Sequence, residues 1–415
     1  MSNLSTLFVV PKLHSNVWVL MLAQALIGSI GPIIVFVGGF IGLKLAPSAV
    51  LATLPVASMV VGIALFMMPA TKMLAKLGRK AGFFTAIILG IANSLFCAFA
   101  IYIENFWLFC SAILLYGITL ATVQQFRFAA MESVAPEKGG SAVSVLLLAG
   151  LIAAFLGPEI AFAGKDFFAI EFVGSFLGIA VLLSLSLIFV SFYQQIEMPH
   201  SEQVSESRPL SVIAKQPIFL ASIICATVGF SVMSFVMTAT PISMHVHSGF
   251  DMAATKWVIQ SHIIAMYLPS FFTGNLIRRF GQSTILYCGI IALLICIAIG
   301  FAGQQYVHYW FALVLLGIGW NFMFVTATAI LPASYRPEEK FKVQGFNDTV
   351  MFSCQALASL SAGWVINTLG WNMLLVICIP LLLTSAFMVL TWQRTSRVKT
   401  SSSIESNNNN LNVKD

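Results

Sequence analysis

Charged residues are scarce in this chain. They make up 9% of its 415 residues, whereas 59% are hydrophobic and the mean hydropathy is +0.94. A soluble domain of this size carries about a quarter charged residues. The composition therefore excludes an ordinary soluble protein and predicts a protein embedded in a lipid bilayer.

Sequence motifs for enzymes, cofactors and metals are also missing. The chain contains no GxxxxGK[ST] loop for ATP phosphates, no HExxH motif, and no nucleophile and base at one depth. Its seven cysteines include no CxxC pair, and His245 and His247 form an i, i+2 pair without a third ligand. We therefore expect no enzymatic activity, no bound cofactor and no metal site, and we expect an ion gradient as the energy source.

The remaining absences concern partners and targeting. No basic run alternates with stacking aromatic residues, so nucleic acid is not an expected partner despite the net charge of +6. No small-residue cleavage site follows the N-terminal apolar stretch, so the first apolar run is expected to stay in an inner or plasma membrane. The expected partners are the bilayer, a small-molecule substrate and protons, and the chain is expected to be a monomer.

Long apolar runs are abundant. A helix needs about 20 apolar residues to cross the hydrocarbon core of a bilayer. Twelve runs meet this requirement, which predicts an all-α membrane protein with both termini in the cytoplasm. The predicted spans are 17–41, 48–70, 81–103, 106–130, 141–163, 170–193, 217–240, 254–275, 283–302, 309–332, 344–366 and 372–393.

The loops between these runs differ in positive charge. All but three of the 21 Lys and Arg residues fall in the N-terminal, C-terminal and loop segments that a start inside the cell makes cytoplasmic. The three exceptions are Lys44, Lys165 and Lys256. Positive residues are retained on the cytoplasmic side of membrane proteins. The charge pattern therefore supports the segmentation and sets its orientation.

The chain divides into two similar halves. The long polar segment 194–216 separates an N-terminal six-helix bundle (1–193) from a C-terminal one (217–395), and residues 396–415 form a polar tail that we predict to be disordered. The loop 71–80 (TKMLAKLGRK) and the stretch 274–282 (GNLIRRFGQ) share a small first residue, apolar residues, a base and a glycine at matching offsets. The two halves therefore read as an internal repeat.

These features resemble the major facilitator superfamily over residues 15–395. The family loop reads roughly G-x-L-a-D-R-x-G-R-K, and Thr71 and Ala75 replace its first glycine and its acid. The resemblance implies two pseudo-symmetric bundles that rock about a central site, with this loop as a cytoplasmic gate. The matching residues are Lys76, Gly78, Arg79 and Lys80 in the first half and Gly274, Leu276, Arg279 and Gly281 in the second, where Arg278 replaces the acid.

Charges within a membrane are costly, so each one has a partner or a function. Asp348 reads either as a proton-coupling or gating residue, supplying the missing acid to Lys76 or Arg79, or as an acid favoured by a helix N-terminus. Arg127 is predicted to bind an anionic group, to pair with Asp348 or Glu132, or to reach lipid phosphates. The remaining candidates are Glu159, for proton uptake or an interfacial position, and His262, for a proton relay or an interhelical hydrogen bond.

Neutral polar residues in the first, fourth, eighth, tenth and eleventh runs suggest a substrate surface. We expect Trp320 to stack on an aromatic ligand and Asn321 to hydrogen-bond it, although polar contacts between helices explain such residues equally well. The candidates are Gln24, Gln124, Gln260, Trp320, Asn321, Asn347 and Gln355.

The sequence therefore predicts a secondary transporter of a small organic solute. The Gly157-Pro158 step resembles part of an antiporter motif and favours proton-coupled export. The alternative is a proton-coupled importer of a vitamin such as a flavin, or of a siderophore. A transport-inactive membrane sensor is a minor alternative.

Overall fold

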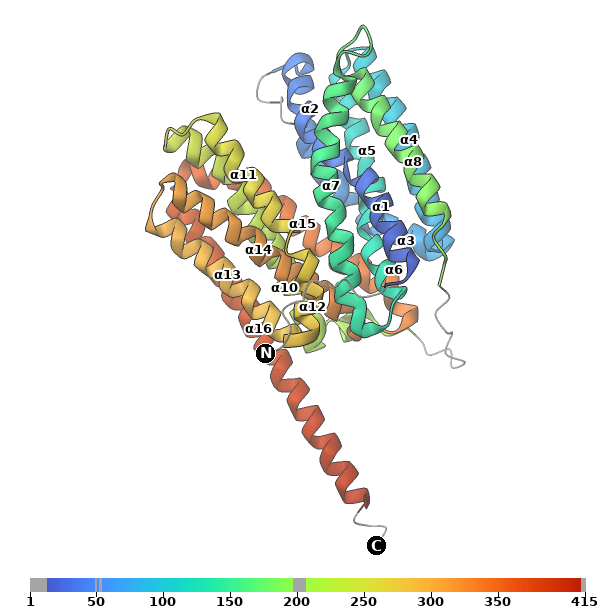
Figure 1. Cartoon of the computed structure of the whole chain (residues 1–415), viewed down its shortest axis with the longest axis vertical. Coiled ribbons are helices and arrows are strands. Elements are labelled where there is room, and N and C mark those ends of the chain that lie inside the picture. Colours follow the sequence, from blue (N-terminus) through green and yellow to red (C-terminus); the bar gives the residue numbers. More distant parts are fainter. Residues whose placement is uncertain (1–12, 49–50, 52–53, 197–206, 412–415) are drawn as a thin grey trace.

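The structure is a computed structural model that describes residues 13–48, 51, 54–196 and 207–411, and its secondary structure is helical throughout that part of the chain (Figure 1). The first half comprises α1 (Ser15–Gly28), α2 (Ile30–Leu45), α3 (Leu54–Leu77), α4 (Arg79–Tyr102), α5 (Phe106–Gln124), α6 (Phe126–Glu132), the 3₁₀ turn η3 (Pro136–Lys138), α7 (Gly139–Lys165) and α8 (Val173–Ser191). The linker carries α9 (Leu210–Ile213). The second half comprises α10 (Pro217–Pro241), the π-helix η4 (Ile242–His247), α11 (Met252–Tyr267), α12 (Ser270–Phe280), α13 (Gln282–Ala302), α14 (Tyr306–Ile330), the 3₁₀ turns η5 (Leu331–Ser334) and η6 (Pro337–Glu339), α15 (Lys340–Thr368) and α16 (Gly370–Leu411).

The predicted crossings correspond to these helices. In the described residues, 11 helices are long and apolar enough to cross a membrane. The predicted eighth crossing, 254–275, is absent from that set because Leu268 and Pro269 divide it into α11 and α12. The pair still follows one path, so the chain has the twelve-crossing, all-α architecture that we expected.

Proline accounts for two of the breaks within crossings. Pro269 has no N–H to donate to the carbonyl of the preceding turn, and its ring crowds that turn. Pro32 acts in the same way beside Ser29, where the first crossing is divided into α1 and α2. The fourth crossing is divided at Gln125, between α5 and α6, without a proline.

Each half has its own apolar core. In the first half α3 packs on α5, α4 on α8 and α1 on α7; in the second half α13 packs on α14 and α10 on α15. Contacts between the halves join α15 to α3 and α12 to α7. The core of the second half extends to Met67, Ala70, Phe128 and Val143 of the first half. The halves therefore share packing where these helices meet.

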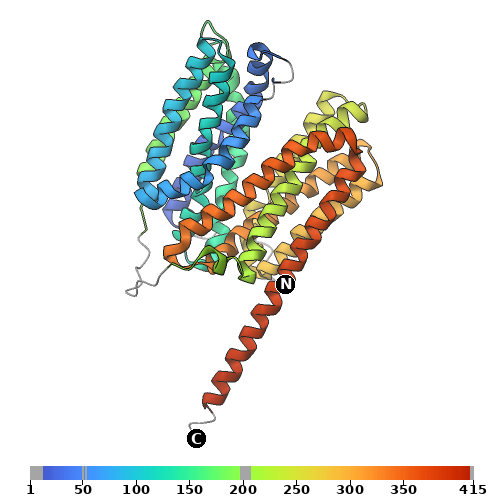
Figure 2. The ribbon, with the colours of Figure 1, turned by 180° about the vertical axis from the view of Figure 1, so that it is seen from behind.

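The two halves approach each other at one end of the molecule and diverge at the other (Figures 1 and 2). We call the closed end, with the α3–α4 turn at Gly78 and the α12–α13 turn at Gly281, the basic end. It carries most of the Lys and Arg residues, and the charge pattern predicts that it faces the cytoplasm. Lys44 and Lys165 lie at the opposite end, where both pair with Glu171 at 3.7 and 3.6 Å.

The linker binds the second half at the basic end. The Arg208 side chain donates to Glu339 Oε1 at 2.8 Å and to Oε2 at 2.6 Å, and Lys342 Nζ donates to the Arg208 carbonyl at 2.6 Å. The hydrogen bonds to Glu339 raise the pKa of Arg208 above its ordinary value. The linker is thereby fixed to the start of α15.

The last helix extends beyond its predicted crossing. The helical backbone of α16 continues to Leu411 and projects from the bundle (Figure 1), whereas the sequence predicts disorder from residue 396. The Ser- and Asn-rich composition that prompted that prediction has a weak helical preference. In the structure these residues continue the long apolar helix α16.

Candidate functional site

A cavity of about 530 Å³ lies between the two halves. Its lining comes from α1, α2, α3, α5 and α7 of the first half and α10, α11, α14 and α15 of the second. Among the described residues that line it, none is charged. Apolar clefts of this size with a few polar groups are typical of binding sites for small organic molecules.

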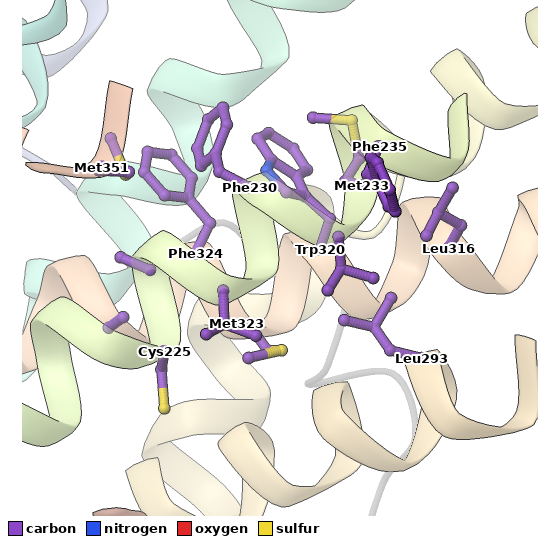
Figure 3. Packing of buried hydrophobic residues seen from close by; sticks show 14 of the residues in the cluster. Cys225, Phe230, Met233, Phe235, Leu293, Leu316, Trp320, Met323, Phe324 and Met351 are labelled. Carbon is purple, nitrogen blue, oxygen red and sulfur yellow. The ribbon is translucent and has the colours of Figure 1, made fainter. Parts of the chain in front are cut away.

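Aromatic side chains from the second half form one wall of the cavity. The Trp320 and Phe324 rings are stacked, with centroids 5.3 Å apart and an interplanar angle of 14°. Phe230 meets Trp320 edge-on at 5.1 Å, and Figure 3 shows the three rings together. Phe352 lies 5.6 Å from Phe230, and Tyr267 lies 6.1 Å from Trp320. The rings are mostly packed on one another, and Trp320, Phe324 and Phe352 are less than a tenth exposed, so the wall meets the cavity with parts of its aromatic surface.

Three glutamines predicted to contact substrate also line this cavity. Gln24 and Gln124 come from the first half and Gln355 from the second. Gln24 Nε2 makes a long hydrogen bond of 3.4 Å to the Leu146 carbonyl, and Gln124 Oε1 accepts from Arg127 Nη1 at 3.4 Å. Their amides retain donor and acceptor capacity for a ligand.

Asn321 has a different position from its predicted one. It is fully buried, and its Nδ2 atom donates to the Met266 carbonyl at 2.8 Å and to Ser270 Oγ at 2.7 Å, while its Oδ1 accepts from Thr273 at 2.8 Å. These bonds bridge the break at Pro269. Asn321 therefore stabilises the α11–α12 junction, and it is not among the described cavity-lining residues.

Two other predicted cavity residues also lie elsewhere. Asn347 is buried, and its Nδ2 donates to Asp348 Oδ1 at 2.9 Å. Gln260 is half-buried on α11. Neither belongs to the described lining of the cavity.

Asp348 and Arg127 form a buried ion pair between the halves. Arg127 Nη2 donates to Asp348 Oδ1, and Gln125 Nε2 donates to Oδ2 at 2.6 Å. The Arg127 guanidinium also lies 5.0 Å from the centroid of Phe324, behind the aromatic wall. The helix break at Gln125 separates two consecutive polar side chains. Gln124 lines the cavity, whereas Gln125 hydrogen-bonds Asp348 of the ion pair.

The hypothesis that Asp348 supplies an acid to Lys76 or Arg79 is wrong. Arg79 pairs with Glu132, whose Oε2 accepts from Nε at 2.7 Å, and Lys76 is exposed. Asp348 lies about two turns into α15, so it is too deep to reach the α3–α4 turn and meets Arg127 instead. Glu132 thus provides the negative charge that the loop 71–80 lacks.

The basic end is sealed by close contacts between helix backbones. A Cβ atom at Gly274 of α12 would lie 2.5 Å from Ser141 Cα of α7, and one at Gly345 of α15 would lie 2.4 Å from Thr71 Oγ1 of α3. Thr71 and Gly274 occupy matching positions in the repeated motif. The first residue of each motif copy therefore lies at a contact between the halves.

The two motif turns have the same backbone conformation. Gly78 and Gly281 have φ of 78° and 84°, a region that favours glycine. Near them, Lys80 Nζ donates to the Ser191 carbonyl at 2.8 Å, and the exposed Arg279 lies 5.3 Å from the Phe280 ring centroid. These glycines reverse the chain between α3 and α4 and between α12 and α13.

The other titratable candidates lie away from the cavity lining. His262 is fully buried, and its Nδ1 lies 2.8 Å from the Leu313 carbonyl, which joins α11 to α14. Glu159 is exposed on α7. The side chains of His245 and His247 lie outside the described ones, and the described residues hold no cluster of three His, Cys, Asp or Glu groups able to bind a metal.

Sequence reasoning missed most of the aromatic wall. Phe230, Tyr267, Phe324 and Phe352 were not predicted to contact substrate, because they are unremarkable in a chain with 35 phenylalanines and eight tyrosines. One signal was available. Phe324 lies four residues after Trp320 and therefore on the same helix face.

Comparisons with known proteins agree with this architecture. The family model of the Major Facilitator Superfamily matches residues 14–255 and 224–413. The chain is 37% identical over 362 residues to the riboflavin transporter RfnT of Brucella anthropi, covering 86% of this chain and 90% of that protein. It is also 28% identical over 350 residues to the uncharacterized MFS-type transporter YdeG of Bacillus subtilis, covering 80% and 81%.

Two solved structures share the fold. One is a bacterial homologue of the iron transporter ferroportin in an outward-facing state, with a TM-score of 0.69, 17% identity and coverage of 91% of this chain and 99% of that one. The other is the human organic anion transporter MFSD10, with a TM-score of 0.72, 14% identity and coverage of 90% and 98%. With the fold, the repeated motif and the family match in agreement, this chain belongs to the major facilitator superfamily of membrane transporters.

Proposed function

We propose that this protein carries riboflavin, or a flavin with the same ring system, into the cell by alternating access. The observation that carries the proposal is the cavity, in which an aromatic wall from the second half faces glutamines that come mainly from the first. The similarity to a riboflavin transporter over most of the chain supports the same substrate.

The chemistry of a flavin suits this cavity. Its fused ring is planar and aromatic, and offset or edge-on aromatic contacts contribute about 0.5–1.5 kcal/mol each beyond the area they bury. One edge of the ring carries carbonyl and N–H groups, which glutamine amides complement as donors and acceptors. Riboflavin has no net charge at neutral pH, and none of the described lining residues is charged.

The state of the molecule is one in which an importer loads its solute. The halves are packed together at the basic end, and the cavity extends away from it to Thr238 and Ser359, which lie in the far parts of α10 and α15. With the basic end in the cytoplasm, the cavity receives solute from outside. Rocking of the halves then opens the basic end and releases the solute inside.

Asp348 is the residue that we assign to proton coupling. Its carboxylate is held by Arg127 across the interface in the state described here, and opening of the basic end separates the two. Because a buried carboxylate without its cation favours the protonated form, a proton that reaches Asp348 from the outside while the cavity is open there favours separation of the pair and opening of the basic end. His262 and Glu159 do not join the halves in this way.

Export by antiport, which the Gly157-Pro158 step favours, has less support. A Cβ atom at Gly157 would lie 2.8 Å from Pro32 Cβ, so this glycine allows α7 to pack against the break in the first crossing. The step therefore has a packing explanation that is independent of the direction of transport.

The test is flavin uptake by a bacterium that neither synthesises riboflavin nor takes it up. Cells producing this protein are expected to grow on low external riboflavin and to accumulate labelled riboflavin, and a protonophore is expected to abolish the accumulation. Cells producing the Asp348→Ala variant serve as the control. Absence of uptake by correctly inserted protein, or net loss of riboflavin from preloaded cells, would reject the proposal.

A further inference from the structure

The polar and aromatic groups of the cavity are arranged at different depths. Phe324 lies at the inner part, where its ring contacts Arg127 of the Arg127–Asp348 ion pair, and Phe230 packs against both Phe324 and Phe352. Hydroxyl groups lie farther from the basic end, on the same helices as two of these rings. They belong to Ser234 and Thr238 of α10 and to Ser359 of α15.

Helix geometry gives the separation between the two zones. Both α10 and α15 begin at the basic end and pack against each other. Thr238 follows Phe230 by eight residues and Ser359 follows Phe352 by seven, so at 1.5 Å per residue each hydroxyl lies about 10–12 Å nearer the mouth than the ring below it.

The hydroxyl zone is available to a ligand. Thr238 Oγ1 and Ser359 Oγ lie 3.2 Å apart and form a hydrogen bond with each other, and Thr238 is exposed. Each hydroxyl has both donor and acceptor capacity, so the pair still has hydrogen-bonding capacity for a further polyol group. Gln355, one turn below Ser359, extends this polar strip toward the rings.

From this arrangement we infer that the cavity holds its substrate in one orientation, with the fused ring inward against Phe230, Trp320 and Phe324 and a hydroxyl-bearing chain directed to Thr238 and Ser359. The inference rests on the proposed function, since it takes a flavin as the substrate. Thr238 and Ser359 are then specificity-determining residues for the ribityl chain. The aromatic wall recognises the ring whatever chain it carries.

The orientation has a consequence for phosphorylated flavins. The terminal hydroxyl of riboflavin lies at the mouth, where a phosphate attached to it remains in water while the cavity is open. Transport requires the mouth to close over it, and the described lining supplies no cation to pair with it. Burial of an unpaired charge is costly. Flavin mononucleotide is therefore expected to compete for binding without being carried.

The decisive experiment measures flavin fluorescence quenching by the purified full-length protein with two ligands. Riboflavin carries the ribityl chain, and lumiflavin carries a methyl group in its place. The double variant Thr238→Val/Ser359→Ala is expected to weaken riboflavin binding about five- to twentyfold, the loss of two modest hydrogen bonds, and to leave lumiflavin binding unchanged. Phe324→Leu is expected to weaken both ligands by the same factor.

The matched control is Ser361→Ala on α15, whose hydroxyl bonds its own helix at the Ala358 carbonyl, 3.0 Å away. Unchanged lumiflavin binding shows that the double variant is folded. The orientation would be overturned if the double variant lost affinity for both ligands equally, or lost no affinity for riboflavin. The proposed function would still stand in either case, provided that the unmodified protein binds riboflavin. Failure of the unmodified protein to bind either flavin would reject both.

Discussion

The two buried arginine pairs of this protein differ in what they join. Arg79 pairs with Glu132 within the first half, whereas Arg127 of the first half pairs with Asp348 of the second. All four side chains are less than a tenth exposed. In the proposed rocking of the halves, the first pair moves as a unit, whereas the second has to separate. Two similar ion pairs thus have different roles in the proposal. Arg79–Glu132 stabilises the first half, and Arg127–Asp348 holds the two halves together until they separate.

The first pair still touches the second half through its edges. Arg79 Nη2 donates to Gln344 Oε1 at 2.9 Å and its guanidinium lies 5.1 Å from the Phe341 ring centroid, while Lys340 Nζ lies 3.5 Å from Glu132 Oε2. The Arg79–Gln344 contact joins a charged group to a neutral one, and the Lys340–Glu132 ion pair is longer than the Arg79–Glu132 pair. They help to close the basic end, and the Lys340–Glu132 ion pair, which crosses between the halves, separates when that end opens.

The largest effect is expected from breaking the pair that joins the halves. Asp348→Asn leaves Arg127 as a buried charge without an anion, which costs about 3–5 kcal/mol in stability. We expect uptake to fall below detection and the unfolding temperature in detergent to drop. Both are measured on the same purified protein.

A double variant separates structure from coupling. Arg127→Gln/Asp348→Asn removes both charges, so it is expected to recover most of the lost stability. Proton-driven accumulation stays absent because no carboxylate remains. Normal accumulation in this double variant would show that the pair serves stability alone.

The next effect concerns the backbone contacts that seal the basic end. Gly274→Ala introduces a Cβ 2.5 Å from Ser141 Cα, which forces α12 and α7 apart. We expect uptake to decrease about tenfold or more, since even one misplaced methyl group in a tight contact costs 1–3 kcal/mol. Gly139→Ala is the control, because its Cβ would meet Met131 at an ordinary 3.7 Å. Equal uptake by the two variants would contradict a backbone seal.

A smaller change in transport is expected from the pair within the first half. Glu132→Gln leaves Arg79, which is as buried as Arg127, without its anion, so it is expected to lower stability by about 3–5 kcal/mol as well. Because Arg79 and Glu132 stay together during rocking, the pH dependence of uptake should match that of the unmodified protein. A pH profile like that of Asp348→Asn would remove the distinction between the two pairs.

The smallest effect is expected at the linker. Arg208 is about a quarter exposed and pairs with Glu339 inside the second half. Arg208→Ala is expected to lower stability by about 1 kcal/mol or less, as solvent weakens such a pair, and to leave uptake unchanged. Thermal unfolding combined with an uptake assay checks both statements.

The sequence predicted the crossings well because hydropathy and loop charge report only whether a segment lies in the membrane or on one side of it. Neither signal requires knowledge of how the helices pack. The repeated motif also predicted matching turns at Gly78 and Gly281. The proline at 269 indicated a possible helix break. The hydrogen bonds that stabilise this break were not predictable, because they come from Asn321 on a different helix. Such long-range hydrogen bonds depend on how helices are rotated about their axes.

The same limitation explains the outcome for the candidate site. Gln24, Gln124, Trp320 and Gln355 line the cavity, whereas Gln260, Asn321 and Asn347 do not. A helix that is apolar on most faces gives no periodic signal for which side meets lipid and which meets the partner half. For the same reason the sequence left four possible partners for Arg127, and only the packed structure selects Asp348.

The uncharged cavity has an electrical consequence. In the proposed mechanism a neutral flavin crosses together with one proton and carries one net positive charge, so we expect the transport cycle to respond to membrane voltage as well as to the pH gradient. Each charge moved through 100 mV supplies about 2.3 kcal/mol, which corresponds to roughly fifty-fold accumulation. A cell with a polarised membrane can therefore concentrate the vitamin even when the pH on the two sides is equal.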